Sequence, residues 1–332
     1  MRKKKVTMKD VAAAVGVSQP TVSIIINHSD SIKISEKTRN KVLNKAKELG
    51  YVLKTNRHQD ITHPRIAFVV NNVNMHDPFM LAISAAKTRA WELGYLLVLF
   101  DFEEVESLKQ AMLAEIVEGH YKGLIYASNS PKTVRHLEQL PDMPIVMLNC
   151  APEMPSTIPV VACADYLGGY RATEHLIKRG YQYIAMIEGE SWSEASILRR
   201  QGYQQALANA DIPAQESWLV YGNWSVRQAY LETLKLLAQK RVPDAIFCAS
   251  DLMAVGCYQA IAKKGLSIPK DIAVMGYDNQ LLASELTPSL SSIDLPYDEM
   301  AKKAIEILCD ESVCENVSLF KIKGELYARD ST

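Results

Sequence analysis

From Arg65 onward, short apolar runs alternate with stretches of helical pattern, and this alternation constrains the fold more than any other feature of the chain. The runs have the length of strands and cover residues 66–70, 95–100, 123–126, 145–148, 184–187, 218–221, 245–248 and 272–276. Strands that alternate with helices on this scale form parallel sheets covered by helices. A break near residues 161–165 divides the runs into two groups and predicts two lobes. Ligands of such folds bind beyond the carboxyl ends of the strands, so function is expected in a cleft between the lobes.

The start of the chain differs from this body in charge. Residues 1–58 carry thirteen Lys and Arg against four Asp and Glu, a net charge of +9, whereas the remainder of the chain carries −10. A compact basic segment predicts a polyanionic partner, because lysines and arginines that neutralise phosphates release counterions. A solvated basic tail would carry the same charge, so the residue pattern has to decide between the two.

That pattern predicts two short helices joined by a tight turn. Thr7 and Asp10 have the spacing of a capping box, so a first helix is expected over about residues 8–15. Gly16 then supplies a left-handed backbone that ends the helix, and Ser18 can cap a second one. The arrangement is typical of a helix-turn-helix motif, although short alternations of small and apolar residues also occur in ordinary core helices.

The spacing of apolar residues predicts which faces of the next two helices are buried. On the second helix Val22 and Ile26 are expected to face inward, which leaves Pro20 and Ile24 on the outer side. A third helix is predicted over residues 36–49, with Ser35 as its cap and lysines on its outer face. Its expected apolar stripe consists of Val42, Leu43, Ala46 and Leu49.

The chain resembles the LacI/GalR family of bacterial repressors. The run TMKDVAAAVGVSQPTVSIIIN, followed by SEKTRNKVLNKAKELGY, is similar to the family's DNA-binding headpiece, and the phrases HDPF, DYLGGYRATEHLIKRGY, RRQGYQQAL, CASDLMAVG and VMGYDN are similar to its sensor core. The resemblance implies an all-α helix-turn-helix headpiece followed by a two-lobed, periplasmic-binding-protein-like α/β core with parallel sheets.

The same resemblance implies the limits of the domains. A DNA-binding head is expected at residues 1–52, a hinge at 53–64, and an effector-binding and dimerisation core at 65–332. Lobe one is expected to comprise about residues 65–163 and 294–320, and lobe two about residues 164–293 and 321–332.

By position in the family, Gln19, Pro20 and Ile24 are implied to read bases. Pro20 and Ile24 cannot make the hydrogen bonds by which arginine or asparagine recognises a base, so contacts with thymine methyl groups and an A/T-weighted half-site are expected. The other DNA-contact residues implied are Thr7, Ser18, Thr21, Ser23, Asn27, Thr38 and Arg39, with Arg57 from the hinge.

The hinge departs from the family pattern. Family members usually insert a hinge leucine into the minor groove, whereas Asp60 stands at that position in this chain. An aspartate facing DNA is repelled by the phosphates. Either Ile61 takes the role through a shift of register, or the groove is not wedged open, and the sequence leaves both alternatives open.

The resemblance places Arg199, Asp278 and Trp224 in the effector cleft. Without it, Arg199 fits a solvated charge, Asp278 a turn of the Asx type, and Trp224 a hydrophobic staple. The remaining lining residues implied are Asp77, Phe79, Asn149, Ser250 and Asp251. An aromatic ring beside arginine, aspartate and asparagine suits a sugar, which is the predicted effector, but a purine would use the same groups.

Other function classes lack support in the sequence. An enzyme carrying a DNA-binding head is the main rival, yet the chain has no glycine-rich phosphate-binding motif, no Gly-x-Ser-x-Gly and no metal-spaced His and Glu. We therefore predict a transcriptional regulator, most simply a repressor, with no catalytic residues, no cofactor and no metal. Six cysteines without a Cys-x-x-Cys pair indicate reduced, buried thiols.

Partners and location follow from the same features. An extracytoplasmic binding protein would need a signal peptide where this chain has helix-forming Lys9 and Asp10, and no apolar run approaches membrane-spanning length. A cytoplasmic protein without a membrane partner is expected. A near-palindromic double-stranded DNA operator implies a homodimer, with its interface at the helix after Pro78 and at the last helices of the body.

Overall fold

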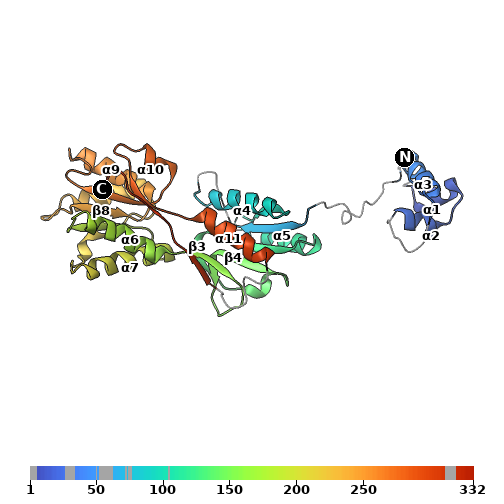
Figure 1. Ribbon diagram of the computed structural model, residues 1–332, viewed down its shortest axis with the longest axis horizontal. Helices are drawn as coiled ribbons and strands as arrows, with labels where there is room; N and C mark the ends of the chain where they lie inside the picture. The colour runs from blue at the N-terminus through green and yellow to red at the C-terminus, as the bar shows by residue number, and fades with distance from the viewer. Residues whose placement is uncertain are drawn as a thin grey trace. The chain divides into compact units, whose positions relative to one another are not determined.

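The computed structural model describes residues 6–26, 34–49, 51, 63–71, 73, 77–103, 105–310 and 319–332. The chain divides into two compact units, residues 1–62 and residues 63–332. Within its described residues the first unit is helical, and the second contains two sheets (Figure 1). The predicted hinge lies almost entirely outside the described residues.

The first unit, here called the head, consists of α1 (Met8–Val15), α2 (Gln19–Ile26) and α3 (Glu36–Glu48). The backbone N–H of Thr7 donates to the Asp10 carboxylate at 2.8 Å and the Thr7 hydroxyl accepts from the Asp10 N–H, which confirms the predicted capping box. Gly16 ends α1 with a φ of +76°. The three helices enclose a small apolar core of Val11, Ala12, Val15, Val22, Ile25, Ile26, Val42 and Ala46.

One predicted core residue of the head is wrong. Leu49 was expected on the buried stripe of α3, but the helix ends at Glu48 and Leu49 is its C-cap, with 36% of its surface exposed. Val42 and Ala46 are buried as predicted, because both lie within the helix, whereas Leu49 follows its last residue. The stripe therefore stops one turn earlier than the sequence pattern indicates.

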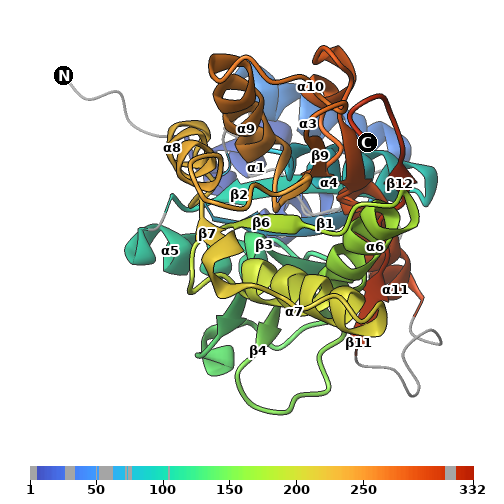
Figure 2. The same ribbon diagram turned by 90° about the vertical axis from the view of Figure 1, so that its left-hand side faces the viewer.

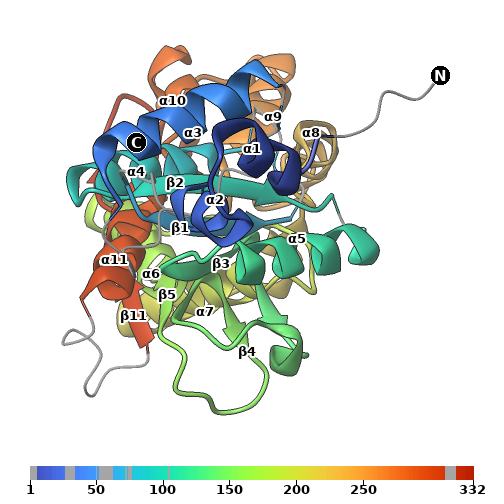
Figure 3. The same ribbon diagram turned by 90° about the vertical axis from the view of Figure 1, so that its right-hand side faces the viewer.

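Lobe one of the body is built on a parallel six-stranded sheet, sheet A, in the order β11-β5-β4-β3-β1-β2. Its strands are β1 (Arg65–Val70), β2 (Leu96–Asp101), β3 (Gly123–Val134), β4 (Ile145–Pro152), β5 (Val160–Cys163) and β11 (Leu319–Ile322). Helices α4 (Met80–Glu92) and α11 (Tyr297–Cys309) cover one face, and α5 (Glu106–Glu118) covers the other (Figure 3). Because both faces of β1 are buried, its sequence after Arg65 is apolar throughout instead of alternating.

Lobe two is built on sheet B, in the order β12-β10-β9-β8-β6-β7. Its strands are β6 (Ile184–Glu188), β7 (Leu219–Tyr221), β8 (Ala245–Cys248), β9 (Ala273–Asp278), β10 (Ser291–Asp294) and the antiparallel β12 (Leu326–Tyr327). Its helices are α6 (Asp165–Lys178), α7 (Glu194–Asn209), α8 (Val226–Leu236), α9 (Asp251–Lys263) and α10 (Leu281–Glu285). Helix α6 packs on α7 and α8 packs on α9, as a pair on each side of the sheet (Figure 2). Two 3-10 helices, η1 (Leu137–Gln139) and η2 (Glu216–Trp218), complete the body.

The chain passes between the lobes three times. It crosses from β5 to α6, from β10 to α11, and from β11 to β12. As a result α11, which is late in the sequence, packs against α4 of lobe one (Figure 1). Likewise β12 pairs with β10 of lobe two. Each lobe is therefore assembled from segments far apart in the sequence.

All eight predicted runs form strands, but the two sheets contain four more. Strand β5 falls at the position where the sequence predicted only a break between the lobes. Strands β10 and β11 have four residues each, and both contain polar side chains, so they give no apolar run. Short strands of this kind form because their neighbours in the sheet supply the hydrogen bonds.

Among the described residues, no helix has the length and apolar character needed to cross a bilayer. In the same part of the chain, no group of three or more His, Cys, Asp or Glu is arranged to hold a metal ion. Burial raises the pKa of the Cys150 thiol to about 12, so it stays protonated at neutral pH. The other free cysteines in the described residues are Cys163, Cys248, Cys257 and Cys309, and Cys314 lies outside them.

Candidate DNA interface and effector cleft

Helix α2 carries the predicted base-reading residues on its outer side. Gln19 and Pro20 are exposed and Ile24 is half-buried, whereas Val22 and Ile25 point into the core of the head. The structure thus brings the three predicted base-reading side chains to one surface of a single short helix. Two of them are apolar, which suits contact with methyl groups better than hydrogen bonding to base edges.

Several predicted phosphate contacts also hold the helices together. The Ser18 hydroxyl accepts from the backbone N–H of Thr21 at 3.2 Å and lies 2.8 Å from the Thr21 hydroxyl. Ser35 caps α3 in the same way through Thr38. These hydroxyls can still approach a phosphate, because a hydroxyl oxygen both donates and accepts. They have a structural role before DNA is present.

Basic residues on α3 extend this surface. Lys37, Lys41 and Lys47 are exposed and Arg39 is half-buried, whereas the ammonium of Lys45 lies 2.9 Å from the Glu48 carboxylate. Of the other predicted contacts, Ser23 is half-buried on α2 and Thr7 belongs to the cap of α1. Asn27, Arg57, Asp60 and Ile61 lie outside the described residues.

In the body, the carboxyl ends of the two sheets meet. The Cys163 thiol at the end of β5 lies 3.9 Å from the Tyr277 hydroxyl on β9. Helix α7 of lobe two also packs against β3 of lobe one. These contacts place the candidate cleft between lobe one and lobe two, at the edge of each sheet where ligands of parallel α/β folds bind.

Arg199 is the centre of a buried network on the lobe-two side. Its Nε donates to Asp165 Oδ1 at 2.8 Å, its Nη1 donates to the carbonyl of Ala249 at 2.6 Å, and Nη1 lies 3.7 Å from Asp278 Oδ1. The guanidinium also stacks 3.6 Å from the centre of the Tyr277 ring. Only 4% of Arg199 is exposed, so the group is fixed by the protein and is not a solvated charge.

Burial and paired charge act in opposite directions on this network. Burial by itself would lower the pKa of Arg199, but the carboxylates of Asp165 and Asp278 raise that pKa above its ordinary value. Burial raises the pKa of Asp278 well above its ordinary value, and Arg199 offsets part of that rise. Arg199 therefore stays charged, with Asp165 as its nearest carboxylate.

Asp251 lies in the same region, at the first turn of α9. It is fully buried and accepts hydrogen bonds from the Ser292 hydroxyl at 2.7 Å and the backbone N–H of Gln280 at 2.8 Å. Burial raises its pKa to about 7. The neighbouring Ser250 caps α9 by accepting from the N–H of Met253 at 3.2 Å. Both residues thus also serve the fold of lobe two.

Trp224 stands beside Arg199 at the end of β7. The indole centre is 5.7 Å from the guanidinium, and the ring packs so closely against Gly189 that a Cβ atom there would overlap it. Asn223 and Trp224 have φ values of +51° and +56°. Non-glycine residues adopt this conformation uncommonly, and here it holds the indole beside Arg199.

The lobe-one candidates are held mainly by polar contacts. Asn149 has a φ of +56° and donates from Nδ2 to the carbonyl of Ser128 at 3.0 Å. Asp77 accepts from the N–H of Phe79 at 2.9 Å and from Asn129 Nδ2 at 2.8 Å. Phe79 packs edge-to-face on Tyr297 with no exposed surface, so in this structure it belongs to the core of lobe one.

Two members of the network were not predicted as site residues. Asp165 and Tyr277 both occur in phrases that carry the family resemblance, but neither was assigned a role. The signal for Asp165 is its place directly after β5, where a polar residue reaches the carboxyl edge of the sheet. Tyr277 is an aromatic residue within an apolar strand, and nothing in its spacing distinguishes it from a core residue.

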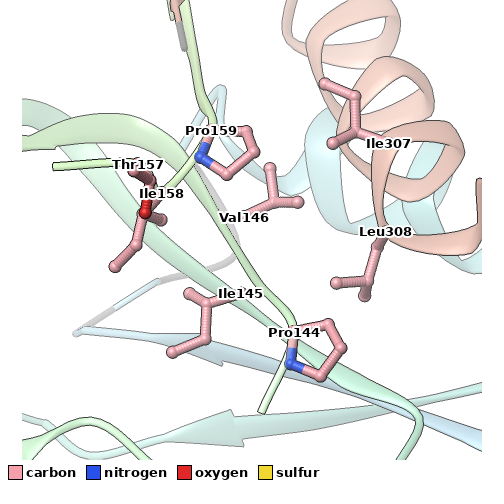
Figure 4. A pocket seen from close by; sticks show the side chains of 8 residues that line it. All are labelled: Pro144, Ile145, Val146, Thr157, Ile158, Pro159, Ile307 and Leu308. Atoms are coloured by element: carbon pink, nitrogen blue, oxygen red, sulfur yellow. The ribbon is translucent and has the colours of Figure 1, made fainter. Parts of the chain in front are cut away.

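Two hollows in the body differ in position and character. A cavity of about 160 Å³ lies between the lobes, where Asn149 and Cys163 of lobe one face Asp165 and Leu198 of lobe two. An apolar hollow of about 300 Å³ lies at the other end of sheet A, near the starts of β4 and β5 (Figure 4). Its lining contains none of the predicted effector residues and consists of Pro144, Ile145, Val146, Thr157, Ile158, Pro159, Ile307 and Leu308.

A helix-turn-helix head joined to a two-lobed body with two parallel sheets defines a transcriptional regulator with a ligand-binding core. Residues 7–53 match the profile of "Bacterial regulatory proteins, lacI family", and residues 63–319 match that of "Periplasmic binding proteins and sugar binding domain of LacI family". The chain belongs to the LacI family. It is a DNA-binding repressor that a small molecule modulates, and not an enzyme.

Similar proteins are known across nearly the whole chain. The "HTH-type transcriptional repressor PurR" of Vibrio cholerae serotype O1 is 30% identical over 98% of this chain and 97% of its own length. PurR of Yersinia pestis is 31% identical over 98% of this chain and 96% of its own length. Among solved structures, the lac repressor dimer bound to operator and the anti-inducer ONPF has a TM-score of 0.73 at 26% identity and covers 99% of both chains. The transcriptional regulator CelR-cellobiose complex has a TM-score of 0.68 at 28% identity, covering 99% of this chain and 100% of that one.

Proposed function

We propose that this repressor binds a carbohydrate, or a derivative of one, in the cleft between the lobes, and that the ligand changes its affinity for operator DNA. The observation that carries the proposal is the indole of Trp224 beside the buried pair of Arg199 and Asp278. The apolar face of a sugar ring packs on an aromatic ring, while charged groups take its hydroxyls through strong hydrogen bonds. The similar CelR structure contains cellobiose, which agrees with this ligand class.

A purine is the second candidate. It is favoured by the relatives named PurR, which match the chain at 30–31% identity over almost its full length. A flat base would stack on Trp224 as a sugar does. Asp278 would then accept a ring N–H instead of a hydroxyl.

A ligand screen separates the two candidates. Thermal unfolding of the purified protein is measured with neutral sugars, sugar phosphates and purines, and operator binding is then measured with and without each ligand that stabilises it. We expect a sugar to raise the unfolding temperature and to change operator affinity, because a ligand that binds only the folded protein stabilises it. Stabilisation by a purine and by no sugar would reject the carbohydrate proposal.

Two variants of aromatic residues locate the ligand. Trp224→Ala is expected to abolish the rise in unfolding temperature, because the ring against which the sugar packs is lost. Tyr183→Ala is the matched control, since Tyr183 is an exposed aromatic residue, also in lobe two, but precedes β6, at the end of sheet B away from the cleft. Equal responses of the two variants would place the ligand elsewhere.

We also propose that Gln19, Pro20 and Ile24 read the operator bases. Ile24→Arg is expected to change base preference at one or two positions of the half-site, because arginine favours guanine where isoleucine meets thymine methyls. Selection of binding sites from a randomised half-site measures the preference. Lys41→Ala is the control for a phosphate contact and should weaken binding to all sequences alike. If Ile24→Arg instead weakens binding to all sequences alike, Ile24 does not read bases.

Finally, we propose that the protein acts in the cytoplasm as a homodimer on a near-palindromic operator. Helix α4 and the edge strand β2 carry a group of exposed apolar side chains, which a monomer rarely leaves in contact with water. These are Leu81, Trp91, Leu96 and Leu99, with 43–60% of their surface exposed. A two-fold interface over this face presents two heads to two half-sites.

A further inference from the structure

Two buried hydroxyls in the body lack hydrogen-bond partners. Within the part of the chain that the structure describes, Ser128 Oγ, Ser196 Oγ and Arg65 Nε are the buried side-chain nitrogen or oxygen atoms without a partner. Ser128 and Ser196 are each 1% exposed. Arg65 bonds through its other guanidinium nitrogens, to the Gly119 carbonyl and the Tyr121 hydroxyl, so only the serines are wholly unsatisfied. Because folded proteins pair nearly all buried polar groups, each orphaned hydroxyl needs an explanation.

Ser128 lies in lobe one, on β3 near the cleft. Its backbone carbonyl accepts from Asn149 Nδ2 at 3.0 Å, whereas its hydroxyl has no partner. The register between β3 and β4 shifts directly after the pair of Ala127 and Leu148. The serine therefore stands at an irregularity within β3, and its main chain is held by a predicted effector residue.

Ser196 lies in lobe two, in the first turn of α7. It precedes Arg199 by three residues, a spacing that puts two side chains on neighbouring positions of one helix face. Arg199 is tied to Asp165 and to the carbonyl of Ala249, so this turn of the helix has a fixed position. Since α7 packs against β3, the two orphaned hydroxyls come from elements that meet between the lobes.

We infer that Ser128 and Ser196 are effector-contact residues, one in each lobe, whose hydroxyls bind hydroxyl groups of the carbohydrate. The inference rests on the proposed function and adds specificity-determining residues to it. A serine hydroxyl donates one hydrogen bond and accepts others, so its best-matched neutral partner is a ligand hydroxyl, which does the same. Arg199 already has carboxylate partners, so the serines provide binding capacity that the protein itself does not use. A ligand bonded to both would join the lobes.

The first test needs no ligand. Thermal unfolding of Ser128→Ala and Ser196→Ala is compared with that of Ser292→Ala, a buried serine whose hydroxyl donates to Asp251 at 2.7 Å. Removing a hydroxyl that has no partner should leave the unfolding temperature unchanged or higher, whereas removing a satisfied one should lower it. If the unfolding temperatures of Ser128→Ala and Ser196→Ala both fall as far as that of Ser292→Ala, the two hydroxyls have partners in the protein and the inference is overturned.

The second test measures ligand affinity by calorimetry, with cellobiose, glucose, galactose and hypoxanthine as probes. For the sugar that binds the wild type best, each variant is expected to bind about five- to tenfold more weakly, the loss that one neutral hydrogen bond predicts. Unchanged sugar affinity in both variants overturns the serine roles and leaves the carbohydrate function intact. A wild type that binds hypoxanthine alone, or none of the probes, overturns the carbohydrate function and the inference with it.

Discussion

At the scale of single residues, Asp165 and Asp278 fix the position and the charge of the Arg199 guanidinium before a ligand binds. The guanidinium lies among two carboxylates, a carbonyl and an aromatic ring, with almost no exposed surface. A buried charge is tolerated only when it is paired and hydrogen-bonded. Arg199, which the resemblance to the family places in the effector cleft, is therefore also part of the structure of lobe two.

Removing Asp165 should destabilise the protein strongly. Asp165→Ala is expected to lower the free energy of unfolding by about 3 kcal/mol, because it leaves a buried guanidinium without its nearest carboxylate. Urea-induced unfolding measures the loss. Glu325→Gln is the control, since the Arg171–Glu325 pair is at the surface and screened by solvent, and it should change stability little. Equal effects of the two variants would contradict the role given to Asp165.

Asp251 should make stability depend on pH. Burial raises its pKa to about 7 from an ordinary value of 3.8, so the folded chain holds this proton more tightly than the unfolded chain. The resulting stabilisation is complete below about pH 4 and is lost as the pH rises through about 7. Urea unfolding between pH 4 and pH 8 should therefore show a decline in stability that Asp251→Asn flattens.

The control for this experiment is Asp142→Asn, which changes an exposed aspartate. It should keep the wild-type slope. An undiminished slope in Asp251→Asn would show that other groups, such as the buried Asp278, cause the pH dependence.

At the scale of elements, the turn between α1 and α2 depends on backbone conformation alone. A Cβ atom at Gly16 would meet nothing within 4 Å, yet the φ of +76° is one that residues with side chains rarely adopt. Gly16→Ala is expected to cost the head about 1 kcal/mol, since a left-handed backbone is unfavourable for L-residues. Hydrogen exchange of the α1 amides measures this cost. Gly16→Asn should lose less stability, because asparagine tolerates the left-handed conformation. An equal loss of stability in the two variants would point to a steric cause.

The helices and strands differ in how far the sequence predicts them. Strand β1 is apolar on both faces, and α1 has a capping box and a terminal glycine, so local signals suffice for both. Strand β10 has the sequence Ser-Ser-Ile-Asp and forms because β9 and β12 flank it. That pairing joins segments distant in the chain, and no local pattern records it.

The same distinction holds for the candidate site. The assignment of Arg199 and Asp278 to the site follows from the resemblance to the family. The position of Asp278 at the edge of sheet B follows from its place at the end of a parallel strand. The stacking of Arg199 on Tyr277 and the missing partners of Ser128 depend on side-chain packing between elements. The sequence alone does not show how side chains from different elements pack against one another.

At the scale of the whole molecule, the exposed face of α4 and β2 should decide oligomeric state. Leu96→Asp places a charge on the edge strand, where a second subunit would have to bury it, so the variant is expected to be monomeric. Light scattering after size-exclusion chromatography measures the mass. Operator affinity should fall as well, because two heads no longer bind as one unit.

Met154→Asp is the matched control, since Met154 is an apolar side chain with 70% of its surface exposed on another part of lobe one. It should retain the wild-type mass and operator affinity. A Leu96→Asp protein that remains dimeric would move the interface to another surface of the body.

The position of Trp224 gives the protein a built-in optical reporter. The chain has four tryptophans, and this indole lies 5.7 Å from the buried positive charge of Arg199. The fluorescence emission of an indole responds to nearby charge and to water. A sugar ring that covers Trp224 would change the indole's exposure to both at once. Occupancy of the cleft could then be followed in real time by intrinsic fluorescence, without a label and with the operator present.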